Sequence, residues 1–318
     1  MTVDGMVFPP NLDYITLGSI TESAEIPVFA HLCAQSLEDE IEQFRQLFSD
    51  VRSRLPISVT GSVFAEDREL CRDNGVKQVS FVFTADYVEM LIGVMQEHIE
   101  VLRFILNHNK LHLPPALTSV RAIFEAMMIS CWYMDTTVDH ETRVARFGAT
   151  LLESATSSVK LARKFVTKSA DVPGKIERLR EVRKLYSTDG FKLNFQISRN
   201  KGKPNKDVVE SLSFKSATVN LRPNYSQLNE RYCPDDPWTY SLLSNFAHST
   251  RMMLGGGETA EEALMTILIP LFDGADAYTQ ALGNYFGFNV EPFLTQRAER
   301  LGFLLAYRHA FAEAGEVD

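Results

Sequence analysis

The sequence lacks the short motifs that mark several large classes of enzyme. It contains no G-x-G-x-x-G or G-x-x-x-x-G-K-[ST] phosphate-binding loop, no H-E-x-x-H zinc motif and no G-x-S-x-G nucleophile turn. No histidine follows a glutamate at a spacing of three residues, which excludes the E-x-x-H ligand pair of di-iron helical bundles. We therefore expect no metal site and no cofactor.

Cysteine is also scarce. The chain has four cysteines, and none of them forms a C-x-x-C motif or a Cys/His pair at zinc-ligand spacing. Isolated cysteines are typical of reduced, buried thiols rather than of disulfides, redox centres or metal sites. We expect this state for all four: Cys33, Cys71, Cys131 and Cys233.

A long apolar run and a basic leader segment are missing too. The longest apolar stretches, 123–134 and 264–272, are too short or too interrupted to cross a bilayer, which needs about 20 residues. Residues 1–11 contain no basic segment followed by an apolar run, as a secretory signal would. These features predict a cytoplasmic protein that does not enter a membrane.

Positive charge is in the minority, but it is concentrated in one region. The 318 residues carry a net charge of −9. Residues 160–222 contain 16 Lys and Arg against 6 Asp and Glu, a balance of +10, so the rest of the chain carries −19. This asymmetry predicts a face for a nucleic acid or an acidic protein partner. The alternative is a basic helix surface that pairs with acidic neighbours.

Three lysines of this region lie in the segment R-N-K-G-K-P-N-K, residues 199–206. Its glycine, proline and asparagines predict an exposed loop. Because phosphate contacts need clustered cations, we take Lys201, Lys203 and Lys206 as candidate binding residues.

Apolar residues recur at helical spacing along most of the chain, which predicts a mainly α protein built as a multi-helix bundle. The helix expected at 116–134 is apolar on nearly every side, so we place it at the centre. The segment 57–83 is ambiguous: it can hold a short helix at 65–72, whereas an Asn74-Gly75 turn and the apolar run 79–83 favour one short β-hairpin near residues 57–83. Other helices are expected at 36–55, 85–108, 140–168, 175–186, 208–217, 235–254, 258–286 and 292–314.

The chain shows no fixed-period repeat. We divide it into an N-terminal extension with one long helix, 1–83, a core helical domain that carries the polar residues, 84–254, and a C-terminal helical pair that packs on the core, 255–318.

Two of the expected helices carry polar side chains on apolar faces. Arg121 and Glu125 are one turn apart on the 116–134 helix. Tyr240, Ser244 and His248 form a stripe on the 235–254 helix and can supply further hydrogen bonds. If the first pair is buried with its helix, Glu125→Ala should cost on the order of 3 kcal/mol or more, because it would leave Arg121 as an unpaired charge.

Two interpretations of these residues are open. They can form a satisfied polar network that determines how the helices pack. Alternatively, they can line a pocket in which Arg121 or Arg143 holds an anion and His248 transfers a proton. The candidate catalytic residues are Arg121, Glu125, Arg143 and His248, and the candidate binding residues on the late helix are Tyr240 and Ser244.

Three segments carry a resemblance to a known family. They read S-V-R-A-I-F-E at 119–125, R-V-A-R-F at 143–147 and Y-S-L-L-S-N-F-A-H-S at 240–249. They resemble an uncharacterised bacterial family of helical proteins with an R-x-x-x-E helix and a late Y-x-x-x-S-x-x-x-H helix, which is loosely grouped with HEPN-like domains. The similarity covers roughly residues 84–254.

The resemblance implies a ribonuclease that uses an R-x(4–6)-H motif, usually across a homodimer. In the late helix Arg251 follows His248 instead of preceding it, whereas R-F-I-L-N-H at 103–108 matches the motif. We therefore expect an interaction or regulatory protein, of a defence or toxin-related system, that uses its basic 160–222 face. The alternative is a HEPN-like ribonuclease or small-molecule enzyme that uses the Arg/Glu/His residues.

Overall fold

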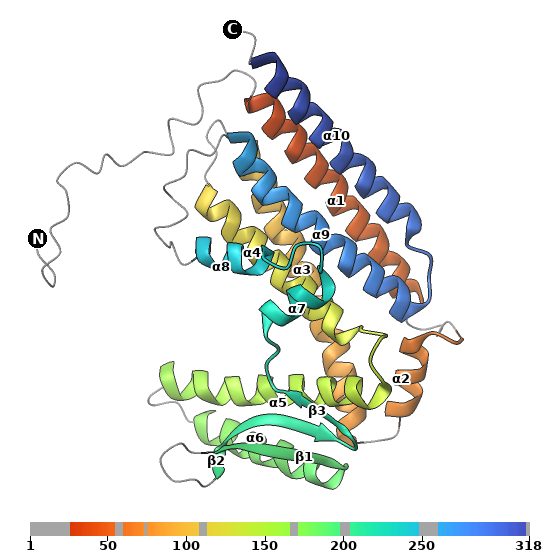
Figure 1. The fold of residues 1–318 in the computed structure, drawn as a ribbon. Coiled ribbons are helices and arrows are strands. Elements are labelled where there is room, and N and C mark those ends of the chain that lie inside the picture. The colour runs from red at the N-terminus through yellow and green to blue at the C-terminus, as the bar shows by residue number, and fades with distance from the viewer. Residues whose placement is uncertain are drawn as a thin grey trace, which may run out of the picture.

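The computed structural model describes residues 26–54, 60–72, 75–107, 113–165, 171–197, 204–247 and 260–315. Within these ranges the chain forms ten helices and one three-stranded antiparallel sheet (Figure 1). The prediction of a mainly α multi-helix bundle is confirmed. The helices are α1 (Ile26–Arg54), α2 (Val63–Cys71), α3 (Gly75–Leu106), α4 (Leu113–Tyr133), α5 (His140–Phe165), α6 (Asp171–Thr188), α7 (Tyr225–Tyr232), α8 (Thr239–Ala247), α9 (Ala260–Phe286) and α10 (Glu291–Gly315); the strands are β1 (Phe191–Ile197), β2 (Pro204–Phe214) and β3 (Ala217–Asn220).

Helix α4 is the centre of the bundle. It packs against α3, α7, α8 and α9, and most of its side chains are buried. Val120, Phe124 and Met127 are wholly removed from solvent. This is the arrangement expected of a helix that is apolar on nearly every side. The long helices α1, α9 and α10 lie side by side along one side of the molecule (Figure 1).

The β-hairpin expected near residues 57–83 is not found in the described part of that range, which is helical instead. Ser62 caps α2 by accepting a hydrogen bond from the backbone NH of Ala65 at 3.2 Å. Gly75 begins α3 with φ of +30°, and the apolar run after it continues this helix with Ser80 and Phe81 buried and Val82 exposed. Periodicity cannot distinguish a strand from a helix in so short an apolar run.

The sheet lies at 191–220 instead, and it overturns the helix expected at 208–217. Strand β2 pairs antiparallel with β1 on one side and with β3 on the other. Strands β1 and β2 follow each other along the chain, but the apolar residues of 208–217 also fit a helical spacing, so the sequence pattern favoured a helix there. Lys206, expected in a loop, lies in β2.

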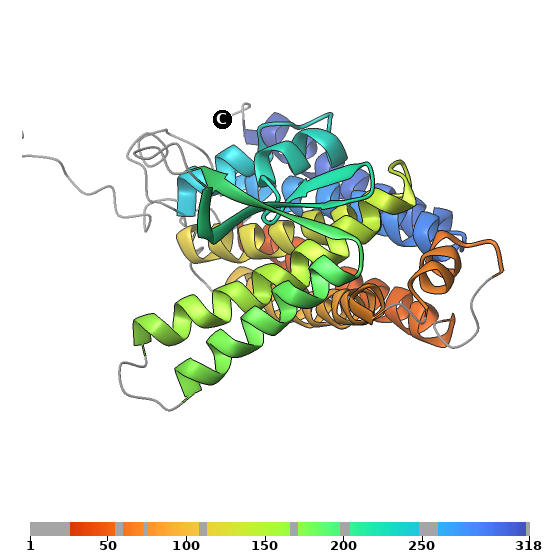
Figure 2. The same cartoon turned by 90° about the horizontal axis from the view of Figure 1, so that it is seen from below.

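The sheet and α6 pack on α5 to form a layer at one end of the molecule (Figures 1 and 2). Gly148 of α5 lies under Phe191, Leu212 and Tyr186, all of which are buried. The Tyr186 hydroxyl donates to the Gly148 carbonyl at 2.6 Å. A glycine at this position lets the strands and α6 approach the backbone of α5 closely.

All four cysteines are buried and free, as predicted. Burial raises the pKa of the Cys33 thiol to about 12, so this side chain stays protonated at neutral pH.

Among the described residues, one helix, α3, is long and apolar enough to cross a membrane by length and composition alone. Mostly buried core helices of soluble proteins pass the same test; α3 packs against α1, α4 and α5, and about a third of its most apolar window is buried (33%). This single helix is weak evidence for a membrane span.

The division into three units stays a prediction. Its first boundary, at 83/84, falls inside α3. One cluster of buried apolar side chains includes Leu37 of α1, Phe124 of α4 and Leu268 of α9, which belong to the three expected units.

Candidate functional site

The polar side chains singled out on α4 and α8 meet at one place. Arg121 Nε donates to Glu125 Oε1 at 2.7 Å, and Arg121 Nη2 donates to the Tyr240 hydroxyl at 3.4 Å. The guanidinium also lies 5.7 Å from the centroid of the Tyr240 ring. Tyr225 of α7, which the sequence analysis missed, stacks on Tyr240 with ring centroids 5.5 Å apart. We call Arg121, Glu125, Tyr225 and Tyr240 the Arg121 cluster.

The Arg121 cluster is less buried than the helix that carries it. The side chains of Arg121 and Glu125 are 21% and 28% exposed, so the pair is not buried with α4. Burial alone lowers the pKa of Arg121, but the hydrogen bond and charge of Glu125, with Tyr240, more than offset this and raise the pKa above its ordinary value. Burial and the Glu125 carboxylate raise the pKa of Tyr240. The cluster therefore holds a charged guanidinium and a neutral phenol at neutral pH.

Ser244 and His248 complete the stripe predicted on the 235–254 helix, of which the structure describes α8. Ser244 lies one turn after Tyr240 and is half-buried. His248, like Arg251, lies outside the described residues. The proton-transfer part of the catalytic hypothesis therefore stays a prediction.

Arg143 belongs to a different cluster. Its Nε and Nη2 donate to the two oxygens of Asp67 at 2.7 and 3.0 Å, and its Nη1 donates to the Val138 carbonyl at 2.5 Å. His140 Nδ1 lies 2.8 Å from the same carboxylate, and the Tyr285 hydroxyl donates to it at 3.1 Å. The guanidinium is thus satisfied by partners on α2 and in the preceding loop, and is not placed to hold an anion beside Arg121.

Arg146, one turn after Arg143 on α5, is also engaged elsewhere. Its Nη1 donates to the Trp132 carbonyl at 2.5 Å and lies 3.4 Å from the Asp135 carboxylate. Asp135 in addition pairs with Arg231 at 2.8 Å and accepts from the Tyr232 hydroxyl at 2.9 Å. Burial lowers the pKa of Arg146. This cluster links α5 and α7 to the end of α4.

The most deeply buried ion pairs join α1 to α10 and were not predicted. Arg297 Nε lies 3.1 and 3.0 Å from the two carboxylate oxygens of Glu40, and Arg300 Nη2 donates to Glu40 at 2.5 Å. Arg297 Nη1 also pairs with Asp276 at 2.6 Å. Glu40 lies three residues after Leu37 and four before Phe44, so it falls on the apolar face of α1, and this charge among core positions was the signal that could have revealed the network.

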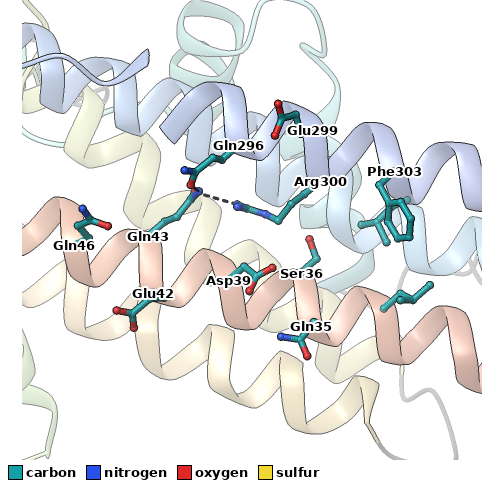
Figure 3. A pocket seen from close by; sticks show the side chains of 12 residues that line it. Gln35, Ser36, Asp39, Glu42, Gln43, Gln46, Gln296, Glu299, Arg300 and Phe303 are labelled. Carbon is teal, nitrogen blue, oxygen red and sulfur yellow. Dashed lines mark hydrogen bonds between the residues drawn. The ribbon is translucent and has the colours of Figure 1, made fainter. Parts of the chain in front are cut away.

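A groove of about 590 Å³ runs between α1 and α10 beside these ion pairs (Figure 3). Gln43 Nε2 donates to Gln296 Oε1 at 2.7 Å across it, and Arg300 Nη2 donates to Gln43 Oε1 at 3.0 Å. The buried Ser36 hydroxyl has no hydrogen-bond partner among the described residues. The groove is open, most of its lining residues are polar although apolar atoms make up most of its exposed surface, and its carboxylates are Asp39, Glu42 and Glu299.

Cations gather on the layer formed by α5, α6 and the sheet, which we call the basic layer. Its exposed cations include Lys160 and Arg163 on α5, Arg178 and Lys184 on α6, and Lys192 on β1. None of these five takes part in an ion pair between described residues. Other cations of the layer are neutralised: the pairs are Arg180–Glu177, Lys215–Glu141 and Arg222–Glu153.

Two of the three lysines predicted to bind an anion, Lys201 and Lys203, lie outside the described residues. Lys206 lies in β2, and its side chain is outside the described set. The cations that can be placed are therefore different residues of the same region.

Comparisons of the chain with protein-family models, curated proteins and solved structures gave no significant match. The HEPN-like resemblance accordingly stays a prediction.

Proposed function

We propose that this protein is an interaction protein whose basic layer binds a nucleic acid. The observation that carries the proposal is the group of five exposed cations on α5, α6 and β1 with no ion-pair partner among the described residues. Unpaired surface cations can release the counterions of a phosphate backbone, which is the main source of sequence-independent affinity.

The negative charge of the residues outside 160–222 also favours binding of a polyanion at the basic layer. Residues outside 160–222 carry −19, so a polyanion is repelled from most of the surface and attracted to the basic layer. An uncharged partner would gain nothing from this arrangement, and a cationic partner would be attracted to the acidic remainder of the chain instead of to the basic layer. We further propose a cytoplasmic location, where nucleic acids are accessible.

The test compares two double variants in binding to a fluorescent single-stranded oligonucleotide over a range of salt concentrations. Arg178→Gln/Lys184→Gln removes two exposed cations from the basic layer, whereas Arg45→Gln/Arg72→Gln removes two exposed cations elsewhere. We expect the first variant to weaken binding and to reduce the slope of log K against log salt by about 1.4, because each lost contact contributes roughly 0.7. The second should bind like the wild type.

Binding that is insensitive to salt, or that falls equally in both variants, would contradict the proposal. If the protein binds polyglutamate but not the oligonucleotide, the partner of the basic layer is an acidic protein and not a nucleic acid.

A further inference from the structure

The groove between α1 and α10 is a second surface, separate from the basic layer (Figure 1). Its α1 wall is one face of that helix, from Leu32 to Gln46. These two residues are about 14 positions apart, which corresponds to about 21 Å or about four helical turns. Because the groove is open along this length, it offers a surface to one side of an elongated occupant instead of enclosing a small molecule (Figure 3).

Both walls of the groove are helices, and this limits the form of the occupant. The backbone groups of a helix bond to one another, so neither wall offers a strand edge to an extended peptide. Contacts with the walls come from side chains. An amphipathic helix binds a groove in this way, through side chains of one face spaced three or four residues apart.

One end of the groove is apolar. Phe303 of α10 lines it and is 57% exposed. Leu32 of α1 lies at the same end, since Phe29 stacks on Tyr307 one turn further along each helix, with ring centroids 5.8 Å apart. An exposed aromatic ring beside a leucine forms an anchor point for an apolar side chain of the occupant.

The charge of the groove comes from its rim. In the buried network below it, the carboxylates of Glu40 and Asp276 balance the guanidiniums of Arg297 and Arg300. The rim carboxylates are exposed, and their only ion pair with a described residue is the one between Glu42 and the exposed Arg45, at 3.5 Å. The rim is therefore acidic, and its carboxylates are Asp39, Glu42 and Glu299.

We propose that this groove docks a basic amphipathic helix of a partner protein. An apolar side chain of that helix contacts Leu32 and Phe303, and its Lys or Arg side chains pair with Asp39 and Glu299. Leu32 and Asp39 are about two helical turns apart, so the docked helix carries its apolar anchor about two turns from its cations. A basic helix complements the acidic rim, whereas an acidic helix is repelled by it.

The first test is fluorescence anisotropy of the full chain with a labelled helical peptide of leucine and lysine, about 18 residues long, at physiological salt. The matched peptide has Glu in place of each Lys. We expect the wild-type protein to bind the lysine peptide and not the glutamate peptide. Asp39→Asn/Glu299→Gln should weaken binding about five- to tenfold, because it removes two carboxylates of the rim. Glu97→Gln/Glu230→Gln removes two exposed carboxylates from α3 and α7 and should bind like the wild type.

The apolar end is tested by a second pair of variants. Phe303→Ala removes the exposed ring of the groove and should weaken binding of the lysine peptide about tenfold. Phe104→Ala makes the same truncation at a 73% exposed position of α3 and should have no effect. Thermal unfolding of both variants should stay close to that of the wild type, since both rings are largely exposed.

Three outcomes would overturn the proposal. The wild-type protein may bind neither peptide or both equally, or the groove variants and their controls may lose binding to the same extent. The third is self-association of the wild-type protein that is lost in Asp39→Asn/Glu299→Gln, measured by sedimentation. That result would assign the groove to the basic layer of a second copy.

Discussion

Charged side chains of this protein differ in how completely they are removed from water. Glu40 and Arg297 are 0% and 1% exposed, whereas Arg121 and Glu125 remain more than a fifth exposed. A buried ion that loses its partner is strongly destabilising, while a pair in contact with solvent is worth much less. Because Arg121 also contacts Tyr240, we reduce our expectation for Glu125→Ala from 3 kcal/mol or more to about 1 kcal/mol.

Glu40→Gln should lower the free energy of unfolding by about 3–5 kcal/mol, because it removes the buried carboxylate that Arg297 and Arg300 share and leaves Arg297 with only the half-exposed Asp276. The measurement is urea denaturation at neutral pH. Glu42→Gln, an exposed carboxylate on the same helix, is the matched control and should change stability by less than about 0.5 kcal/mol. A similar small change for both variants would show that the Glu40 network contributes little.

At the scale of elements, α5 is the helix of the basic layer that connects α6 and the sheet to the bundle. Its first turn is tied to α2 through Arg143 and Asp67, and its middle receives the sheet and α6 around Gly148. The orientation of the basic layer therefore depends on the close contact at Gly148, and a side chain there would separate α5 from the strands.

Gly148→Ala should destabilise the protein by about 1–3 kcal/mol. A Cβ at this position would lie 2.8 Å from Leu212, 3.0 Å from Phe191 and 3.1 Å from Tyr186, and these buried neighbours have little room to move. Gly93→Ala on α3 is the control, since a Cβ there meets nothing within 4 Å. It should stabilise by up to about 1 kcal/mol through helix propensity. Thermal unfolding of both variants distinguishes a packing role from a general effect of glycine in helices.

At the scale of the whole molecule, acidic charge outweighs basic charge and is itself unevenly placed. Burial, followed by the charges of Asp236, Asp276 and Asp235, raises the pKa of Asp273 to about 6. An aspartate whose pKa is higher in the folded state than in the unfolded state costs stability when it ionises. The cost is fully present above pH 6 and disappears as the pH falls toward about 4, the ordinary value for an aspartate.

Asp273→Asn should therefore be more stable than the wild type at pH 7, by about 1–2 kcal/mol after solvent screening. The difference should shrink between about pH 6 and pH 4 and vanish below about pH 3, where the wild-type carboxyl is protonated in both states. Urea denaturation of the two proteins at each pH measures it. A constant difference across this range would mean that Asp273 does not titrate as its surroundings imply.

The sequence by itself determined the local features of the protein. Helical periodicity predicted a mainly α bundle with a central helix at 116–134, and both are found. The spacing of four residues placed Arg121 and Glu125 on one face, where they form a hydrogen bond. These features depend on residues a few positions apart, which is the range that helical geometry relates.

Only the tertiary structure decided which distant groups meet. Arg143 was expected beside Arg121 but pairs with Asp67, 76 residues away, and Glu40 meets Arg297 across 257 residues. The apolar run in 57–83 was taken for a strand and is helical, whereas the segment at 208–217 was taken for a helix and is largely strand. Periodicity constrains each segment alone, but long-range pairs and strand partners are selected by the packing of the whole chain, because only there are buried charges and backbone groups satisfied.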